Sequence, residues 1–262
     1  MKDSDHFAAG LVPMSARLEA IVELAEQGDT VCDVGCDHAH VPIRLLQTAS
    51  YRHAIGMDVI AGPLGKARGN LALYGMVEQV ELRLSDGLDA LSPGEADTLV
   101  ITGMGGTLME EILLRRPSVT GSFTALVLGP QSDPEKVRAA LRTLGFTIKK
   151  EKMIFEDGKY YPVIRAESNA SAPAGDGQAV SPRITQELED KFGPVLLQMR
   201  DPVLFEFLRR RTAVLQKILA SISQAAENTS GDPALLEKHL ARKQEIEHEL
   251  TAFQTALSLY SV

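Results

Sequence analysis

Short apolar runs alternate with segments of helical periodicity along the first part of the chain. Apolar side chains at three- and four-residue spacing, Leu18, Ile21, Val22, Leu24 and Ala25, predict a helix over about 15–27. Apolar runs bounded by glycine, proline or polar residues predict buried strands at about 30–35, 53–58, 79–84, 97–102 and 125–128. Further helices are expected to begin near Val41-Pro42, after Gly62-Pro63, and at Pro134 with Asp133 as its cap.

Two longer apolar runs, 146–154 and 160–166, flank the segment Glu156-Asp157-Gly158-Lys159. An Asp-Gly pair between two such runs is typical of a β-hairpin turn. The order of elements is therefore five βα units closed by an antiparallel hairpin, which predicts an α/β fold with a mostly parallel sheet. We expect this unit to span residues 1–167.

The second part of the chain has a different pattern. Residues 168–182 are mostly small and polar, which indicates a flexible linker. Beyond it, mostly apolar residues repeat with alternating spacings of four and three, the coiled-coil pattern: Leu204, Leu208, Arg211, Leu215, Ile218 and Ile222, then Ile246, Leu250, Phe253 and Leu257. We expect residues 183–262 to form a helical hairpin that turns near 228–233, with Arg211 as a polar interruption of its seam.

Composition and charge narrow the class of protein. The chain has 262 residues, 44% of them hydrophobic and 24% charged, which is typical of a globular protein, and no apolar run is long enough to span a membrane. The polar, acidic start argues against a signal peptide, so we expect a cytoplasmic protein. A net charge of −8 does not point to nucleic acid, although a local basic patch is enough to bind RNA. Candidate patches, each of which could equally be a solvated surface, are Arg115-Arg116, Lys149-Lys150 with Lys152, and Arg209-Arg210-Arg211.

The two cysteines, Cys32 and Cys36, both lie where the first strand ends. Two thiols four residues apart lack the second ligand pair of a structural zinc site, and a disulfide is unexpected in a reducing compartment. The pair His38 and His40, with His53 further on, also suggests a metal, but alternate residues at a turn rarely converge on one ion. We expect reduced cysteines that serve packing, and no metal.

Acids follow the predicted strands at the end where open α/β sheets bind ligands. Asp33, Asp58 and Asp86 end or follow the first three strands. A single acid at this position is often a helix cap, but three in successive βα turns favour a ligand. Their carboxylates suit a ligand that presents hydroxyl, amino and cationic groups.

The same turns exclude the commonest nucleotide ligands. A dinucleotide fingerprint would place glycines after Gly35, where Asp37 and His38 stand, and carboxylates there repel a pyrophosphate. The phosphate-binding G-x-x-x-x-G-K-[ST] sequence is also missing. These residues favour a cationic nucleoside without phosphates, and S-adenosylmethionine fits, with Asp58 on its ribose and Asp86 on its adenine.

This arrangement resembles the class I S-adenosylmethionine-dependent methyltransferases, whose sheet is Rossmann-like, over roughly residues 17–166. Particular motifs are similar to the bacterial tRNA (adenine-N1)-methyltransferase family that modifies adenine 22: Arg17-Leu18, 33–39, 85–88, 101–108, 156–161, 191–194, 201–202 and 205–208. The resemblance implies methyl transfer to N1 of an adenine in tRNA, with the C-terminal, coiled-coil-like helical domain positioning the RNA. After the fifth strand, where that family commonly has Gln-Pro-Asn, this chain has Gly129-Pro130-Gln131.

From these motifs and from the chemistry of methyl transfer we hypothesise a set of site residues. Cofactor binding is expected of Arg17, Asp33, Gly35, Cys36, Asp58, Asp86, Gly87 and Gly103, with Arg17 on the cofactor's carboxylate. The acceptor pocket is expected at Thr102, Met104, Gly105 and Gly106, where missing side chains let an adenine approach closely. Asp37 and His38 are the candidate catalytic residues. The competing interpretations are that Asp37 caps the next helix, that His38 is structural and that Arg17 is exposed.

Two rival functions stay open at this point. One is a methyltransferase of the same fold that acts on a small molecule or a protein, and the other is a non-catalytic RNA-binding protein. The apolar seam of the helical hairpin does not decide between them, because such a seam also serves dimerisation. We expect tRNA as the partner, no membrane association, and a monomer or weak dimer.

Overall fold

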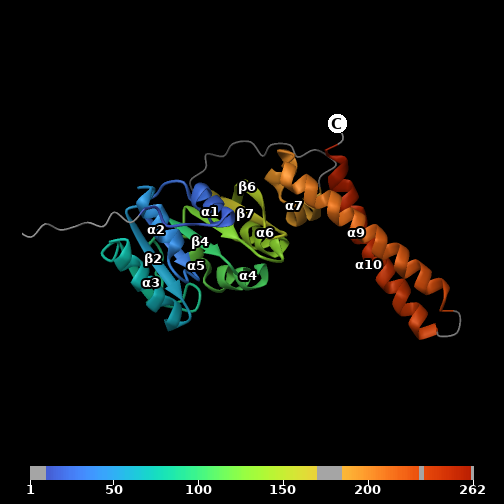
Figure 1. Ribbon diagram of the computed structural model, residues 1–262, viewed down its shortest axis with the longest axis horizontal. Coiled ribbons are helices and arrows are strands. Elements are labelled where there is room, and N and C mark those ends of the chain that lie inside the picture. The colour runs from blue at the N-terminus through green and yellow to red at the C-terminus, as the bar shows by residue number, and fades with distance from the viewer. Residues whose placement is uncertain (1–9, 170–184, 230–232, 261–262) are drawn as a thin grey trace, which may run out of the picture. The chain divides into compact units, whose positions relative to one another are not determined.

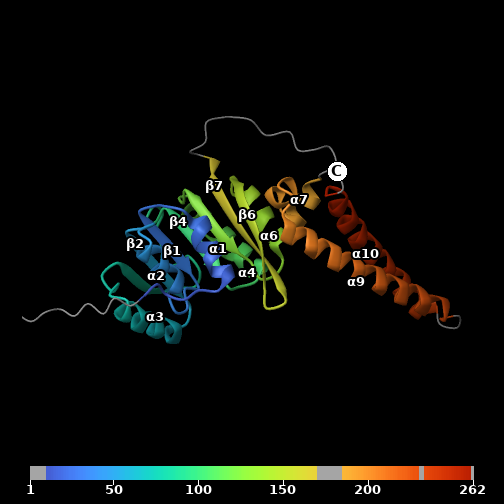
Figure 2. The same cartoon turned by 45° about the horizontal axis from the view of Figure 1, so that its top comes forward.

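The computed structural model describes residues 10–169, 185–229 and 233–260. The chain divides into two units, Met1–Gln178 and Ala179–Val262. The first contains a seven-stranded sheet and the second is helical (Figures 1 and 2). The division falls inside the segment expected to be a linker, most of which lies outside the described residues.

The sheet has the strand order β3-β2-β1-β4-β5-β7-β6. Its strands are β1 Thr30–Val34, β2 His53–Asp58, β3 Val80–Leu84, β4 Thr98–Thr102, β5 Ala125–Gly129, β6 Phe146–Glu156 and β7 Lys159–Ser168. The first five pair in parallel, whereas β7 runs antiparallel to both β5 and β6. The predicted Rossmann-like sheet with a terminal hairpin is confirmed, and β7 extends to Ser168, one residue into the expected linker.

Helices cover both faces of this sheet. The helices α1 Ala16–Ala25, α2 His40–Gln47 and α3 Ala61–Leu73 pack on one face, and α4 Gly106–Arg115, α5 Pro117–Thr120 and α6 Pro134–Thr143 on the other. Neighbouring strand residues alternate between the two apolar layers, as Val100 and Leu99 do on β4. Both faces of the sheet are therefore excluded from solvent, which explains why the strands appear in the sequence as continuous apolar runs.

The start of α6 differs from the expectation. Asp133 has a left-handed backbone, with φ of 48°, and its side chain caps no backbone N–H of the helix. Its carboxylate instead accepts hydrogen bonds from Ser132 Oγ at 2.8 Å and Thr107 Oγ1 at 3.4 Å. The predicted capping role was wrong because the left-handed turn directs this side chain toward α4 rather than along α6.

The second unit contains α7 Gln186–Phe192, α8 Pro194–Gln198, α9 Pro202–Glu227 and α10 Pro233–Ser258. The two long helices lie side by side (Figures 1 and 2). The seam is buried at Leu204, Leu208, Leu215, Ile246, Leu250 and Phe253 but only partly at Ile218 and Ile222. Arg211 is compensated by Glu249, with 3.0 Å between the charged atoms. Among the described residues, no helix has both the length and the apolar character that a membrane span requires.

Candidate functional site

A pocket of about 150 Å³ opens where β1 and β4 end, at the point where the strand order reverses. Parallel sheets bind small molecules at this point because the loops of the two neighbouring strands turn to opposite faces. The pocket brings together many of the expected residues: Arg17, Asp33, Gly35, Cys36, Asp37, His38, Thr102 and Gly103. It also contains Leu18, His40 and Val41, which were not among the expected cofactor, acceptor or catalytic residues.

The turn after β1 forms one wall of the pocket. Gly35 has φ of 76°, and a Cβ on it would lie 3.0 Å from Met104 Cε, so both backbone and space call for glycine. The backbone N–H groups of Gly35 and Cys36 donate to Met57 O at 2.8 and 3.0 Å. Two further residues, Asp37 and Ala39, are also left-handed, with φ of 46° and 59°. Such strain in non-glycine residues is typical of functional turns.

Asp33 is the most perturbed carboxyl of the pocket. Its side chain is buried, and Oδ1 has no hydrogen-bond partner. Burial, reinforced by the nearby charge of Asp58, raises the pKa of Asp33 to about 7. A cationic group bound in the pocket would satisfy this carboxylate and reverse the shift of its pKa.

Arg17 supplies the opposite charge. Its Nε and Nη1 atoms are buried and have no hydrogen-bond partner, and the side chain is only 18% exposed, so the interpretation as an exposed helix-start arginine was wrong. Its neighbours are Glu156, with 3.8 Å between Nε and Oε2, and the Tyr161 ring, whose centroid lies 5.0 Å from Cζ. Sequence reasoning assigned these two residues no role, although both belong to the hairpin motif at 156–161.

Asp37 and His38 lie at the mouth of the pocket. Their side chains are 63% and 37% exposed, with 3.4 Å between Asp37 Oδ2 and His38 Nε2. The N-cap of α2 is Ala39, and no side chain caps this helix, so the interpretation of Asp37 as a helix cap was wrong. The His40 ring lies 5.6 Å from that of His38, and burial, followed by the proximity of His38, lowers the pKa of His40.

Asp58 ends β2 beside the pocket but does not line it. Its Oδ1 accepts from Ile60 N at 2.9 Å and its Oδ2 from Asp37 N at 3.3 Å, which ties the two turns together. Val59, Ile60 and Leu84, the last paired in register with Asp58, are about 60% exposed. Large exposed apolar side chains beside an acid are a signal that sequence reasoning missed, because exposure is not visible in a sequence.

Asp86 also lies outside the pocket lining, on an exposed loop. Both of its carboxylate oxygens lie 3.0 Å from Arg115 guanidinium nitrogens, and this hydrogen-bonded ion pair lowers the pKa of Asp86. Gly87 follows with φ of 57°, and a Cβ on it would meet Arg115 Nη2 at 2.9 Å. No sequence pattern indicated this pairing, which joins residues 29 positions apart.

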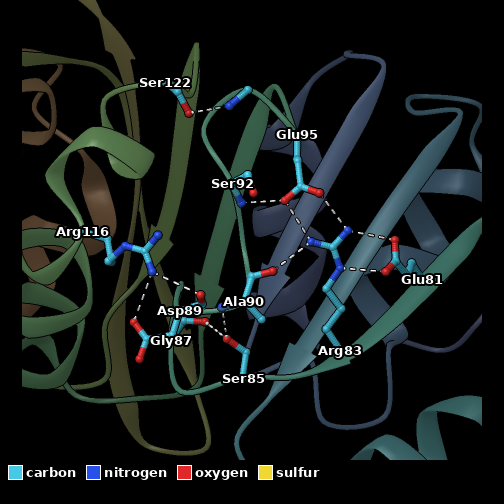
Figure 3. A network of polar contacts seen from close by, with 11 residues as sticks. Glu81, Arg83, Ser85, Gly87, Asp89, Ala90, Ser92, Glu95, Arg116 and Ser122 are labelled. Carbon is cyan, nitrogen blue, oxygen red and sulfur yellow. Dashed lines mark hydrogen bonds and ion pairs between the residues drawn. The ribbon is translucent and has the colours of Figure 1, made fainter.

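A polar network holds the rest of that loop (Figure 3). Arg83 binds Glu81 and Glu95 and donates to Ala90 O at 3.0 Å, while Ser85 Oγ donates to Gly87 O at 2.9 Å. The loop from β3 to β4 is therefore fixed from both sides by charge-assisted hydrogen bonds.

The candidate basic patches are largely paired with acids. Arg116 contacts Asp89, whose backbone oxygen it reaches at 3.1 Å (Figure 3). The other pairs are Arg115 with Asp86, Lys150 with Glu26, Lys152 with Glu23, Arg209 and Arg210 with Glu206, and Arg211 with Glu249. Most of the charges in the candidate patches are therefore paired with an acid, although Arg209 and Arg210 share one carboxylate.

The turn after β4 is divided between two roles. Thr102 and Gly103 line the pocket, whereas Met104, Gly105 and Gly106 do not. Gly106 N donates to Ser132 O at 2.8 Å, and a Cβ on Gly106 would lie 2.2 Å from Asp133 O. The missing side chain at Gly106 thus serves packing against the loop that follows β5. Within the described part of the chain, no cluster of three or more His, Cys, Asp or Glu could hold a metal ion.

Comparison with known proteins identifies the family to which the chain belongs. A family model described as a methyltransferase domain matches residues 14–164, more than half of the chain. The chain belongs to this methyltransferase family. The methyltransferase is 29% identical over 238 residues to the tRNA (adenine(22)-N(1))-methyltransferase of Bacillus subtilis, a match that covers 90% of this chain and 96% of the relative.

Solved structures of similar proteins support the same family. The m1A22 tRNA methyltransferase of Bacillus subtilis is 26% identical, with a TM-score of 0.79 and coverage of 94% of this chain and 99% of that one. A putative tRNA (m1A22) methyltransferase of Streptococcus pneumoniae, solved in complex with S-adenosyl-L-methionine, is 26% identical, with a TM-score of 0.75 and coverage of 94% and 100%. The resemblance inferred from the sequence motifs is confirmed.

Replacing Gly106 with alanine tests the packing of the β4 turn. We expect Gly106→Ala to lower the free energy of unfolding by about 1–3 kcal/mol or more, because its methyl group would overlap the Asp133 carbonyl. The matched control is Gly65→Ala in α3, where a Cβ meets nothing within 4 Å and better helix propensity stabilises by roughly 0.4–1 kcal/mol. Urea denaturation measures both, and equal effects of the two substitutions would contradict this packing role.

The pKa of Asp33 makes stability depend on pH. This carboxyl ionises near 3.8 in an ordinary environment but near 7 in the fold, so the folded state holds the extra proton between these values. The free energy of unfolding of the ligand-free protein is expected to fall as pH rises from about 4 to 7, by up to roughly 4 kcal/mol at about 1.4 kcal/mol per pKa unit. Asp33→Asn removes this part of the pH dependence, and parallel curves for the two proteins would show that Asp33 does not titrate there.

Proposed function

We propose that this methyltransferase transfers the methyl group of S-adenosylmethionine to N1 of an adenine in tRNA, at adenine 22. The observation that carries the proposal is that one pocket contains an acidic and a basic group, Asp33 and Arg17, each with buried polar atoms that lack a hydrogen-bond partner. S-adenosylmethionine offers an ammonium and a carboxylate at its amino-acid end, which match these two groups. The similarity to the Bacillus subtilis enzyme, over nearly its full length, supports tRNA as the acceptor.

We infer which of the described residues would contact each part of the cofactor. Asp33 would accept from the ammonium, and Arg17 would donate to the carboxylate, in the bidentate manner that guanidinium favours. Asp58 keeps lone pairs beyond its two backbone contacts and would accept from the ribose hydroxyls. The exposed apolar side chains at the ends of β2 and β3 offer a surface for the adenine ring, which Asp86 would approach from its Arg115-bound loop.

When bound, S-adenosylmethionine supplies a methyl group on a positively charged sulfur, already activated for displacement. Adenine N1 has a free lone pair, so no residue of the chain has to remove a proton first. The pocket's main tasks are to align the acceptor with the methyl group and to exclude water. Positive charge passes to the adenine ring during transfer, and Asp37, with His38 beside it, is suited to stabilise that charge.

The acceptor adenine has to leave its base pair or stack, because N1 lies on the Watson–Crick edge. We infer that the helical unit, residues 183–262, helps to hold the tRNA in that state while residues 168–182 act as a linker. The Bacillus subtilis relative aligns over 96% of its length, which supports a shared role for the C-terminal part. The proposal places the enzyme in the cytoplasm with its tRNA substrate, as a monomer or weak dimer.

Methylation of defined tRNA tests the proposed function. The purified protein is incubated with methyl-labelled S-adenosylmethionine and a tRNA transcript with adenine 22, and a transcript with guanine 22 serves as the control. We expect 1-methyladenosine at position 22 of the first transcript only. Label in small molecules or protein instead would favour the first rival function, and tRNA binding without transfer would favour the second.

The role of Asp37 is tested separately. We expect Asp37→Ala to lower kcat by about 100-fold or more through loss of charge stabilisation, with little change in cofactor affinity. Single-turnover kinetics and equilibrium binding separate the two effects. An unchanged kcat would exclude Asp37 from the chemical step.

A further inference from the structure

The tip of the β6–β7 hairpin contacts the start of α1. Glu156 Oε1 accepts a hydrogen bond from Arg17 N at 3.1 Å, and its Oε2 lies 3.8 Å from Arg17 Nε. The Tyr161 ring lies under the guanidinium, with 5.0 Å between Cζ and the ring centroid, which is a cation–π geometry. One hairpin therefore approaches the Arg17 side chain with both a charge and an aromatic face.

Strand pairing explains why the hairpin reaches the Arg17 side chain. Pairing between β5 and β7 extends from Ala125↔Glu167 to Leu128↔Ile164, so residues 159–163 continue beyond it at the pocket edge of the sheet. The turn residues Asp157 and Gly158 are both left-handed, with φ of 49° and 77°, as a tight two-residue hairpin requires. Glu156 and Tyr161 are thus held on a rigid ladder rather than on a loose loop.

The Arg17 side chain is held without being satisfied. Its Nε and Nη1 are buried without a hydrogen-bond partner, and the 3.8 Å separation from Glu156 is too long for a hydrogen bond. Buried donors left unpaired are costly, so a long, flexible arginine would turn to water unless something retained it. The charge of Glu156 and the face of Tyr161 retain it, and neither occupies its donors.

We propose that Glu156 and Tyr161 are positioning residues that keep Arg17 aimed at the carboxylate of the bound cofactor. The inference rests on the proposed function, because it assumes that S-adenosylmethionine occupies the pocket. Glu156 is suited to this role since one of its oxygens is already engaged by the Arg17 backbone. It orients the side chain through charge while the guanidinium donors stay available to a second carboxylate.

The test compares two ligands that differ by one carboxylate, S-adenosylmethionine and decarboxylated S-adenosylmethionine. Equilibrium binding gives the ratio of their Kd values for each variant. We expect the wild-type protein to prefer S-adenosylmethionine by about tenfold or more, equivalent to about 1.4 kcal/mol. Arg17→Ala should bring the ratio close to one.

The hairpin variants then decide the inference. We expect Glu156→Gln and Tyr161→Leu each to reduce the ratio at least threefold while the Kd for the decarboxylated ligand stays within twofold. The conservative substitution Tyr161→Phe, which keeps the aromatic ring, should keep the wild-type ratio. Tyr160→Leu, a change at the neighbouring position of the same strand, should leave the ratio unchanged.

Two other results have distinct meanings. If Glu156→Gln and Tyr161→Leu keep the wild-type ratio, or weaken both ligands equally, the hairpin is merely structural and the inference is wrong. If the wild-type protein binds neither ligand, the proposed function itself fails, and the inference fails with it.

Discussion

Parallel pairing of β1 with both β2 and β4 is the constraint on which the site depends. It brings the ends of these strands to one edge, so Asp33, Asp58 and Thr102 lie near one another although they are far apart in sequence. Helices on both faces of the sheet exclude water from the strands. The pocket lies at the carboxyl ends of the strands, where the strand order reverses between β1 and β4. The loops then need only small adjustments, such as the left-handed turn at Gly35, to shape the site.

At that edge of the sheet, burial of the Asp33 carboxylate costs folding free energy. Its pKa, raised to about 7, means that the ligand-free fold disfavours the ionised form relative to an exposed carboxyl. Arg17 is in a comparable position, because its buried nitrogens lack acceptors. A fold that tolerates two such groups in one pocket gives up stability that a ligand of complementary charge can restore, which is the usual trade at a binding site. The hairpin contacts of Glu156 and Tyr161 belong to the same arrangement, because they keep Arg17 in place until a carboxylate arrives.

Much of this was predictable from the sequence, for physical reasons. The strands are buried on both faces, so their apolar runs identified them, and the acids at their ends located the pocket residues Asp33 and Asp37. Side-chain pairing could not be predicted, because Arg115 and Asp86, or Arg17 and Glu156, meet only through the tertiary fold. The packing role of Gly106 could not be predicted for the same reason, since the backbone that fills its side-chain space comes from the β5–α6 loop. The short helices α7 and α8 have too few turns to show a periodicity.

The proposed binding of S-adenosylmethionine depends above all on the Asp33 carboxylate, which would receive the cationic amino-acid end of the molecule. The most direct measurement is the Kd of S-adenosylmethionine for the wild-type protein and for Asp33→Asn, an almost isosteric change that removes the negative charge and replaces one acceptor oxygen with an NH2 donor. Titration calorimetry at neutral pH is expected to show affinity weakened by at least about tenfold, as for loss of a charge-assisted hydrogen bond of about 1.5–3 kcal/mol. Equal affinity of the two proteins would contradict the account.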